Sequence, residues 1–369
     1  MTNSSILDSG ITQQKGIHLK GLNGIRAIAA LSVVISHALL SLQYFGAKKV
    51  EGGWDFATYG VTMFFTLSGF LITYLLIKEK DAFSTINIKE FYVRRVLRIW
   101  PLYYFYILLA LVFIFFNFRE SLSGGVLFYY LFMGGNICFA MGLTIPLLGH
   151  FWSLGVEEQF YLFWPWLVKR FHPLKSISFF LLFFFLLKAI MRITVPELFW
   201  YKLISITKFD CMAIGALCAI LIDRNNRLFI SLSFNKFSQI ASWSIILLAA
   251  FDKLKIPDFI NQDVFSAASA IIILNVAFNK NSLISLENRV FSFLGKISYG
   301  MYVYNSLVIY CLGLLLNNKL SFLNNFCIAT LVIVLAIAVT ILISWLSYQY
   351  LEKYFLRFKP RFSKVLSHP

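Results

Sequence analysis

The chain has 369 residues, of which 59% are hydrophobic, 18% aromatic and only 14% charged. Soluble proteins are about 45–50% apolar and about 25% charged, so this composition excludes a soluble globular protein, a disordered chain and a disulfide scaffold and indicates an integral membrane protein. The net charge of +16 comes from 33 Lys and Arg residues against 17 Asp and Glu residues. Because the basic residues flank apolar segments, they indicate membrane orientation and no nucleic-acid partner.

Ten apolar stretches approach the length of about 20 residues that a helix needs to cross a bilayer. They are residues 25–44, 57–77, 100–118, 152–170, 176–194, 205–222, 238–252, 263–279, 297–316 and 325–350. The segment 122–143 is apolar but rich in glycine, and we expect it to be re-entrant or interfacial. The expected fold is therefore an all-α polytopic bundle of about ten transmembrane helices.

Most of the Lys and Arg residues lie in loops on one side of the expected bundle, the side that carries both termini. Cytoplasmic loops are enriched in these residues, so we expect both termini to be cytoplasmic and the protein to be a multi-pass protein of the cell inner membrane. We expect a tail at residues 1–18, a membrane domain at 19–356 and a basic tail at 357–369. The five cysteines have no metal-ligand spacing and predict no metal site.

The first span carries two ionisable residues, Arg26 and His37, which are costly at membrane depth and therefore candidates for function. They are eleven residues apart. At about 100° and 1.5 Å per residue, both side chains lie on one helix face, roughly 16 Å apart along the axis. Two interpretations stand: an anchoring arginine with a hydrogen-bonded core histidine, or a functional pair.

The third span is preceded by a group of three arginines, Arg94, Arg95 and Arg98. Arg95 and Arg98 are three residues apart and share a helix face. Three arginines exceed what anchoring at the membrane surface requires, and planar guanidinium groups suit bidentate contacts with phosphate. The pattern fits an anchor and an anion site equally well.

Two adjacent carboxylates, Glu157 and Glu158, lie near the start of the fourth span. The positive end of the helix dipole can stabilise one of them. The other needs a basic partner or an aqueous cavity, which favours a functional role or a place in a polar network.

Other polar and small residues lie at membrane depth. The polar ones are Ser68, Lys208, Asp210 and Asn305. Lys208 and Asp210 are close enough in sequence to form a local ion pair instead of a binding site. Gly69 and Gly215 predict close packing between helices.

Six sequence motifs follow one another along roughly residues 19–356. The first two are Leu22-Asn23-Gly24-Ile25-Arg26-Ala27 with His37, and Gly60-Val61 with Phe64-Phe65-Thr66-Leu67-Ser68-Gly69-Phe70-Leu71. The third and fourth are Arg95-x-x-Arg98-Ile99 with Pro101, and Phe151-Trp152-Ser153-Leu154 with Glu157-Glu158-Gln159-Phe160-Tyr161. The last two are Phe209-Asp210 with Gly215, and Leu294-Gly295-x-x-Ser298-Tyr299 with Tyr302, which Glu352 follows. In this order they resemble the acyltransferase-3 family of polytopic membrane acyltransferases. Three positions depart from the family pattern: Asn305 where many members have a histidine, Thr62 where an acidic or amide residue is common, and Lys208 where arginine is common.

The resemblance implies transfer of an acyl group, usually acetyl, from acetyl-CoA or another acyl-CoA to a hydroxyl. Its implied partners are the lipid bilayer and a glycan or lipid-linked glycan, such as the O-antigen of lipopolysaccharide or an exopolysaccharide. No metal is implied.

The resemblance also implies roles for particular residues. The expected catalytic residues are His37, Arg26, Glu157 and Glu158, the expected donor-binding residues are Arg94, Arg95, Arg98 and Ser68, and the expected acceptor-binding residues are Asp210, Lys208, Tyr299 and Asn305. His37 is expected to act as general base or to carry the acyl group itself. Glu157 or Glu158 is expected to orient His37 or to hold hydroxyls of the acceptor.

Two other classes of function fit an apolar chain with buried charges. A secondary transporter would use a similar number of spans, but it predicts internal repeats, which the sequence does not show. A non-catalytic membrane sensor would keep the fold and lose the chemistry. The retained Arg26, His37 and Glu157-Glu158 argue against that loss.

Overall fold

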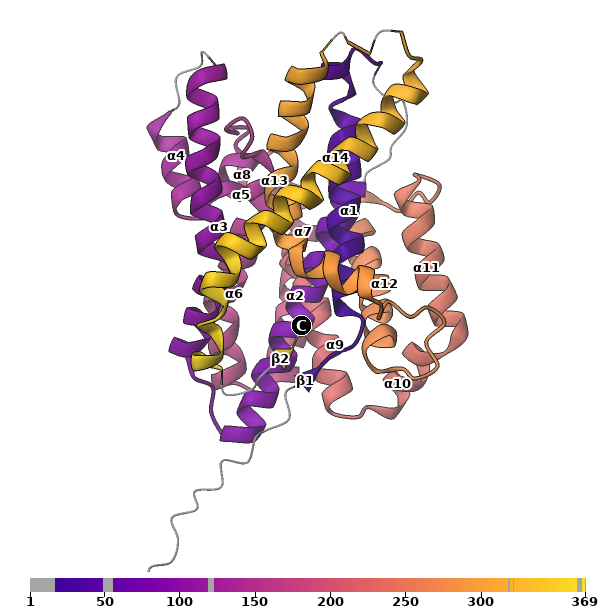
Figure 1. Cartoon of the computed structure of the whole chain (residues 1–369). Coiled ribbons are helices and arrows are strands. Elements are labelled where there is room, and N and C mark those ends of the chain that lie inside the picture. Colours follow the sequence, from indigo (N-terminus) through magenta and orange to yellow (C-terminus); the bar gives the residue numbers. More distant parts are fainter. Residues whose placement is uncertain are drawn as a thin grey trace, which may run out of the picture.

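The computed structural model describes residues 17–48, 56–118, 123–317, 319–320, 322–363 and 367–368, and this part of the chain is a bundle of helices (Figure 1). The helices are α1 (Leu22–Leu40), α2 (Phe56–Phe83), α3 (Ile88–Asn117), α4 (Gly124–Leu131), α5 (Gly135–Ala140), α6 (Trp152–Arg170), α7 (Pro173–Thr194), α8 (Phe199–Thr207), α9 (Phe209–Asp223), α10 (Arg227–Phe234), α11 (Lys236–Ala250), α12 (Asp258–Phe278), α13 (Arg289–Leu316), α14 (Asn325–Ser347) and α15 (Lys353–Leu356). Short turns are η1 (Leu42–Phe45), η2 (Gly149–Phe151), the π-helical η3 (Tyr348–Glu352) and η4 (Lys359–Phe362). Two-residue strands β1 (Ile17–His18) and β2 (Ser367–His368) pair in parallel.

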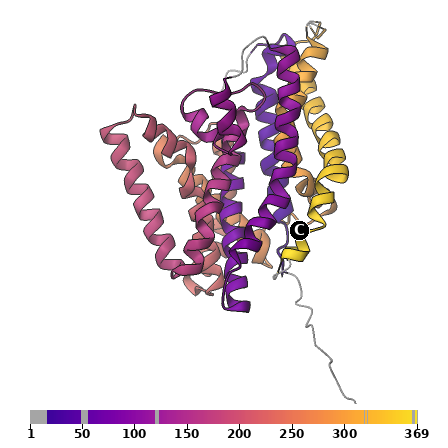
Figure 2. The same ribbon diagram turned by 90° about the vertical axis from the view of Figure 1, so that its left-hand side faces the viewer.

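Within the described ranges, eight helical runs are long and apolar enough to cross a membrane. They are α1, α2, α3, α7, α8 with α9, α12, α13, and α14 through η4. The expectation of an all-α polytopic membrane protein is confirmed. Figure 2 shows α7 at the edge of the bundle, away from α14, and most of its apolar surface is exposed.

Two expected spans form helices that do not meet this length and composition. The span expected at 152–170 is α6, which is too polar because it contains both glutamates, Lys169 and Arg170. The span expected at 238–252 is α11, whose 15 residues extend only about 22 Å against a hydrocarbon core of about 30 Å. From residue 123 onward, the expected re-entrant segment forms α4 and α5, and neither helix is long enough to cross.

The third helix begins earlier than the expected boundary at residue 100. Asn87 caps it by accepting a hydrogen bond from the backbone N–H of Glu90 at 3.2 Å, so the helix starts at Ile88. The expected start at residue 100 was wrong for the helix, because the capping residue Asn87 lies in a polar stretch that a hydropathy analysis assigns to a loop. As a consequence, the three arginines of this region lie on the same helix as the apolar span, and Arg95 and Arg98 are at the helical spacing expected from the sequence.

The centre of the bundle contains α1, which packs against α2, α13 and α14. Helices α2 and α9 approach each other most closely through two glycines. A Cβ atom on Gly69 would overlap the carbonyl oxygen of Met212, and one on Gly215 would overlap that of Thr66. The predicted role of these glycines in close helix packing is thereby confirmed.

The two ends of the bundle differ in composition, and we name them for reference. The basic end is the end at which α1 begins, and the far end is the end at which α1 stops. At the basic end Arg94 donates to the carbonyl oxygen of Phe362 at 2.6 Å, so the turn η4 is attached to α3. Strands β1 and β2 pair at this end, and the two ends of the described chain therefore lie side by side (Figure 1).

Candidate active site

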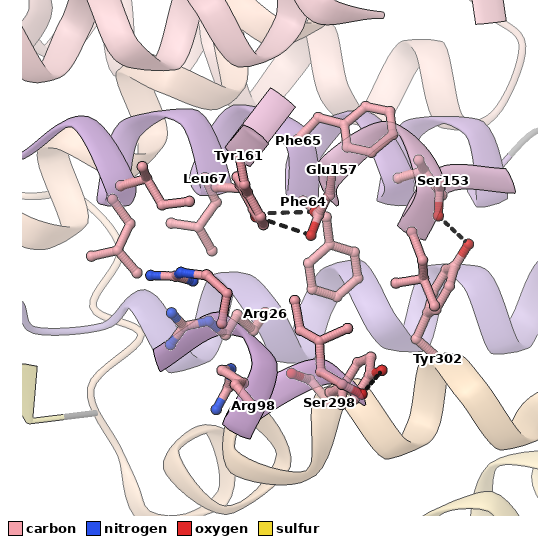
Figure 3. Close-up of a pocket in the computed structure, with 18 residues that line it drawn as sticks. Arg26, Phe64, Phe65, Leu67, Arg98, Ser153, Glu157, Tyr161, Ser298 and Tyr302 are labelled. Atoms are coloured by element: carbon pink, nitrogen blue, oxygen red, sulfur yellow. Dashed lines mark hydrogen bonds between the residues drawn. The ribbon is translucent and has the colours of Figure 1, made fainter. Parts of the chain in front are cut away.

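A cavity of about 110 Å³ lies among α1, α2, α3, α6 and α13, and we call it the arginine cavity. Its polar lining residues are Arg26, Ser68, Arg95, Arg98, Ser153, Glu157, Tyr161, Ser298, Tyr299 and Tyr302. Figure 3 shows Arg26 and Arg98 at one side of the cavity, with Ser153 and Tyr302 at the opposite side. The cavity therefore has a cationic side and a hydroxyl-lined side.

The cationic side is formed by three guanidinium groups from two helices. Arg26 donates to the side-chain oxygen of Asn23 at 3.0 Å. Arg95 lies over the ring of Tyr161 at 5.4 Å, and its Nε is buried without a hydrogen-bond partner among the described residues. Because a buried donor without a partner is costly, this arrangement favours an anionic ligand in the cavity.

One carboxylate, that of Glu157, faces the arginines across the cavity. Its Oε1 accepts from the hydroxyl of Ser68 at 3.0 Å. Its Oε2 accepts from the hydroxyl of Tyr161 at 3.1 Å, and Figure 3 shows the side chains of Tyr161 and Glu157 facing each other. The two hydroxyl groups fix the orientation of the carboxylate. Three cations against this carboxylate leave the lining positively charged.

Two of the residues expected at this site lie outside the lining of the cavity. Arg94 forms an ion pair with Glu79 at 3.1 Å, which together with its bond to Phe362 engages the guanidinium elsewhere. Glu158 has a buried Oε1 without a hydrogen-bond partner among the described residues, and it also lies outside the lining. Adjacent residues on a helix point about 100° apart, which separates Glu158 from Glu157.

A second cavity of about 690 Å³ lies toward the far end, and we call it the histidine cavity. Its polar lining includes His37, Ser41, Tyr44, His150, Lys208 and Ser306. Val61 and Tyr302 line both cavities, so the two are neighbours separated by these side chains. Tyr302 donates to the carbonyl oxygen of His150 at 2.6 Å and accepts from Ser153 at 2.5 Å, which fixes its phenol at this boundary.

The tautomer of His37 follows from its contact with Asn305. The amide nitrogen of Asn305 donates to the carbonyl oxygens of Met301 at 3.2 Å and Tyr302 at 2.5 Å. The amide oxygen must therefore face His37, whose Nδ1 lies 2.5 Å away. Nδ1 carries the proton in this arrangement, and Nε2 keeps its lone pair. Asn305, and neither Glu157 nor Glu158, is the group that orients this imidazole.

A second histidine, His150, lies beside His37, and the sequence did not single it out. The two ring centroids are 6.1 Å apart in an edge-to-face arrangement. Nε2 of His150 donates to the carbonyl oxygen of Val303 at 3.1 Å, and Nδ1 lies 3.1 Å from the hydroxyl of Ser306. Burial lowers the pKa of His150 to about 3, so its ring is neutral at pH 7. His150 directly precedes the Phe151-Trp152 motif, and this position was the sequence feature that could have indicated a role for it. The residues around His150 in the sequence do not indicate that it lies beside α1.

The expected acceptor-binding residues are divided among different places. Lys208 lines the histidine cavity and donates to the side-chain oxygen of Gln262 at 3.3 Å. Tyr299 lines the arginine cavity and donates to the carbonyl oxygen of Ile99 at 2.9 Å. Asp210 lies in the lining of neither cavity.

The partner of Asp210 differs from the local pair considered from the sequence. Asp210 forms an ion pair with Lys188 of α7, and Lys188 also lies 3.5 Å from Asp263 of α12. This cluster, in which Asp210 is buried and Lys188 and Asp263 are half-buried, connects three helices. In the described part of the chain, no group of three or more His, Cys, Asp and Glu side chains could hold a metal ion.

Comparison with known proteins finds one matching family model and several curated relatives. A family model described as an acyltransferase domain matches residues 19–345. O-acetyltransferase OatA of Staphylococcus aureus is 33% identical over 174 residues, which is 44% of this chain and 27% of that protein. Peptidoglycan O-acetyltransferase OatA of Listeria monocytogenes is 33% identical over 159 residues, which is 40% of this chain and 24% of that protein.

The similarity to these curated relatives covers only part of each protein. The chain spans about a quarter of the length of the curated relatives it matches. No solved structure matches the chain.

Proposed function

This chain belongs to the acyltransferase-3 family of membrane proteins, and on that premise we propose that it transfers an acetyl group from acetyl-CoA to a hydroxyl of a cell-surface glycan. The observation that carries the proposal is the pair of adjacent cavities, one lined by arginines and the other by an oriented histidine, which share Val61 and Tyr302. A donor in one cavity and an acceptor in the other would meet at this boundary. The names of the O-acetyltransferase relatives support the acetyl group and the oxygen acceptor.

The donor enters from the basic end, which faces the cytoplasm in this proposal because cytoplasmic loops are rich in Lys and Arg. The phosphates of coenzyme A are anionic, and guanidinium groups bind phosphate through paired hydrogen bonds. Arg26, Arg95 and Arg98 supply these groups. The pantetheine arm then runs toward Ser153 and Tyr302, so that the thioester reaches the boundary with the histidine cavity.

The acceptor hydroxyl is activated by His37. Its Nε2 takes the hydroxyl proton while the oxygen attacks the thioester carbonyl carbon, which forms a carbon–oxygen bond. The carbon–sulfur bond breaks, and the proton passes from the imidazolium to the departing thiolate, which leaves as coenzyme A thiol. Asn305 keeps the proton of the neutral ring on Nδ1, so the lone pair stays on the nitrogen that faces the reaction.

The glycan lies in the histidine cavity, which is about six times larger than the arginine cavity. Its lining combines aromatic faces such as Trp152 with hydrogen-bonding groups such as Tyr44 and Lys208. Small-molecule sites combine apolar walls with a few placed polar groups in this way. A cell-surface glycan or its lipid-linked precursor reaches this cavity from the far end, and the protein acts in the cell inner membrane.

The proposal is tested with detergent-purified protein and acetyl-CoA carrying a labelled acetyl group. We expect thiol release that depends on an added glycan, and we expect the label in an ester on that glycan, detected by mass spectrometry. The acceptor panel contains peptidoglycan fragments, lipopolysaccharide and exopolysaccharide. Purified protein that fails to bind acetyl-CoA would contradict the donor assignment, and labelled amide in place of ester would contradict the acceptor chemistry.

A further inference from the structure

A third cavity lies outside the two already described, at the basic end between α13 and the run from α14 to α15. Its volume is about 810 Å³, and we call it the lateral cavity. Its lining includes Arg289, Ser292, Lys296, Trp345, Gln349 and Lys353. None of these residues lines the arginine cavity or the histidine cavity, so the lateral cavity is a separate site.

The lateral cavity arises from the way α13 and α14 cross. The helices are in close contact at Gly300, where a Cβ atom would lie 3.0 Å from the Cβ of Ser344. Toward the basic end their ribbons diverge (Figure 1). Arg289, Ser292 and Lys296 follow one another at helical spacing and therefore share the face of α13 that meets this opening. Tyr299 of the same helix lines the arginine cavity.

The lining of the lateral cavity is positively charged. Arg289, Lys296 and Lys353 are exposed, and none of them forms an ion pair within the described ranges. Glu287 is the acidic residue of the lining, and its carboxylate accepts a hydrogen bond from the backbone N–H of Gly21. The three cations are thus available to an external anion.

Large apolar side chains accompany these cations on the same helices. Phe293 and Trp345 line the cavity and are 41% and 39% exposed, and Val290, three residues before Phe293 on α13, is 66% exposed. In a membrane protein such surface faces acyl chains. Aromatic residues beside Lys and Arg are typical of the interface between headgroups and hydrocarbon. A ligand that satisfies both features has an anionic headgroup and apolar tails.

We propose that the lateral cavity binds the phosphodiester headgroup of an anionic phospholipid. Basic pockets between transmembrane helices bind such headgroups. Arg289, Lys296 and Lys353 contact the phosphate, Ser292 and Gln349 bond to the headgroup, and Trp345 packs against the first part of the acyl chains. None of the residues of the lateral cavity lines the arginine cavity or the histidine cavity, so the site is distinct from the proposed donor and acceptor sites.

The test measures lipid binding by the full chain in detergent. The ligands are short-chain phosphatidylglycerol, phosphatidylcholine with the same acyl chains, and soluble glycerol phosphate. We expect phosphatidylglycerol to bind and to raise the melting temperature, and we expect the other two to do neither at the same concentration. The double variant Lys296→Gln, Lys353→Gln is expected to bind phosphatidylglycerol at least tenfold more weakly.

A matched control removes two exposed cations from α10 and α11. The double variant Arg227→Gln, Lys236→Gln changes the net charge equally and is expected to keep the affinity of the wild type. Gln349→Trp obstructs the cavity without removing a charge and is expected to lose binding. If the variant Lys296→Gln, Lys353→Gln fails to fold, Gln349→Trp still tests whether the lateral cavity binds the lipid.

Three results would overturn the proposal. Equal losses in the two double variants would mean that binding follows net charge and not the lateral cavity. Equal binding of phosphatidylcholine would show that the site does not distinguish an anionic headgroup from a zwitterionic one. Equal binding of glycerol phosphate would show that the site takes a soluble phosphate and that the acyl chains contribute nothing.

Discussion

The arginine cavity and the histidine cavity are neighbours, but they differ in volume and in the charge of the side chains that line them. The arginine cavity is small and holds three guanidinium groups facing one carboxylate, Glu157. The histidine cavity is about six times larger and contains two imidazoles with fixed tautomers. In the proposed mechanism the arginine cavity holds negative charge, and the histidine cavity presents the lone pair of a neutral imidazole.

Separating these tasks has a chemical benefit. A guanidinium beside an imidazole disfavours the protonated imidazole, which would make the ring a poorer base. In the proposed mechanism the donor phosphates are therefore neutralised by guanidinium groups of the arginine cavity, and no arginine of the described ranges lines the histidine cavity. Helix α1 connects the two sites, because Arg26 lines the arginine cavity and His37 lines the histidine cavity.

The largest expected effect comes from removing the base itself. His37→Ala is expected to lower kcat for acetyl transfer about 10²–10⁴-fold, the range that general acid–base catalysis contributes. The dissociation constant for acetyl-CoA should stay unchanged, because the arginine cavity is intact. Steady-state turnover and equilibrium binding of acetyl-CoA measure the two quantities.

The matched control is His172→Ala, which removes an exposed histidine at the start of α7. It should leave both quantities unchanged. Near-normal acetyl transfer by His37→Ala would contradict the direct mechanism and the acyl-histidine variant alike. A loss of acetyl-CoA binding in this variant would show that the two cavities are not separate sites.

The features that could be predicted from the sequence are those that helical geometry determines within one helix, such as which residues share a face. The spacing of Arg26 and His37 placed both on one face of α1, and the spacing of Arg95 and Arg98 placed both on one face of α3; in the structure the first pair lines two adjacent cavities and the second pair lines one. Gly215 was assigned to close packing for a reason equally local, its lack of a side chain.

Contacts between helices were not predictable in the same way. Asn305 is 268 residues from His37 in sequence, and only the packing of α1 against α13 brings them together. His150 was missed for the same reason. Arg94 resembled its two neighbours in sequence, but its partner Glu79 lies on another helix. The sequence gives no indication of which arginine an ion pair will engage.

Removing each of two neighbouring arginines, Arg98 and Arg94, is expected to have different effects. Arg98→Ala is expected to weaken acetyl-CoA binding about tenfold or more, because hydrogen bonds to charged groups contribute about 1.5–3 kcal/mol. Arg94→Ala is expected to leave that affinity unchanged and to lower the free energy of unfolding by about 3–5 kcal/mol, because it leaves the buried Glu79 without its cationic partner.

Titration calorimetry with acetyl-CoA and thermal unfolding of both variants separate the two roles. Arg98→Ala should melt close to the wild type. If Arg94→Ala lost affinity as strongly as Arg98→Ala, the donor site would extend beyond the arginine cavity to the turn η4. If neither variant lost affinity, the cavity would not bind the donor.

The smallest expected effect concerns Asn305, which positions His37 and touches neither substrate in the proposed mechanism. Asn305→Leu removes the acceptor for Nδ1–H and leaves the ring free to adopt the other tautomer. We expect kcat to fall about tenfold, since both neutral tautomers become accessible once the bond, of about 0.5–1.5 kcal/mol, is lost. The KM for acetyl-CoA should not change, because Asn305 does not line the arginine cavity.

A structural control distinguishes this role from a general loss of packing. Asn275 in α12 is also buried and donates to two backbone carbonyl oxygens, those of Ser233 and Ile271, at 2.8 Å each. Asn275→Leu should lower the melting temperature as much as Asn305→Leu while leaving kcat unchanged. If the two variants lost kcat equally, the effect at Asn305 would be one of stability, and the orientation of His37 would have to come from the packing of the histidine cavity itself.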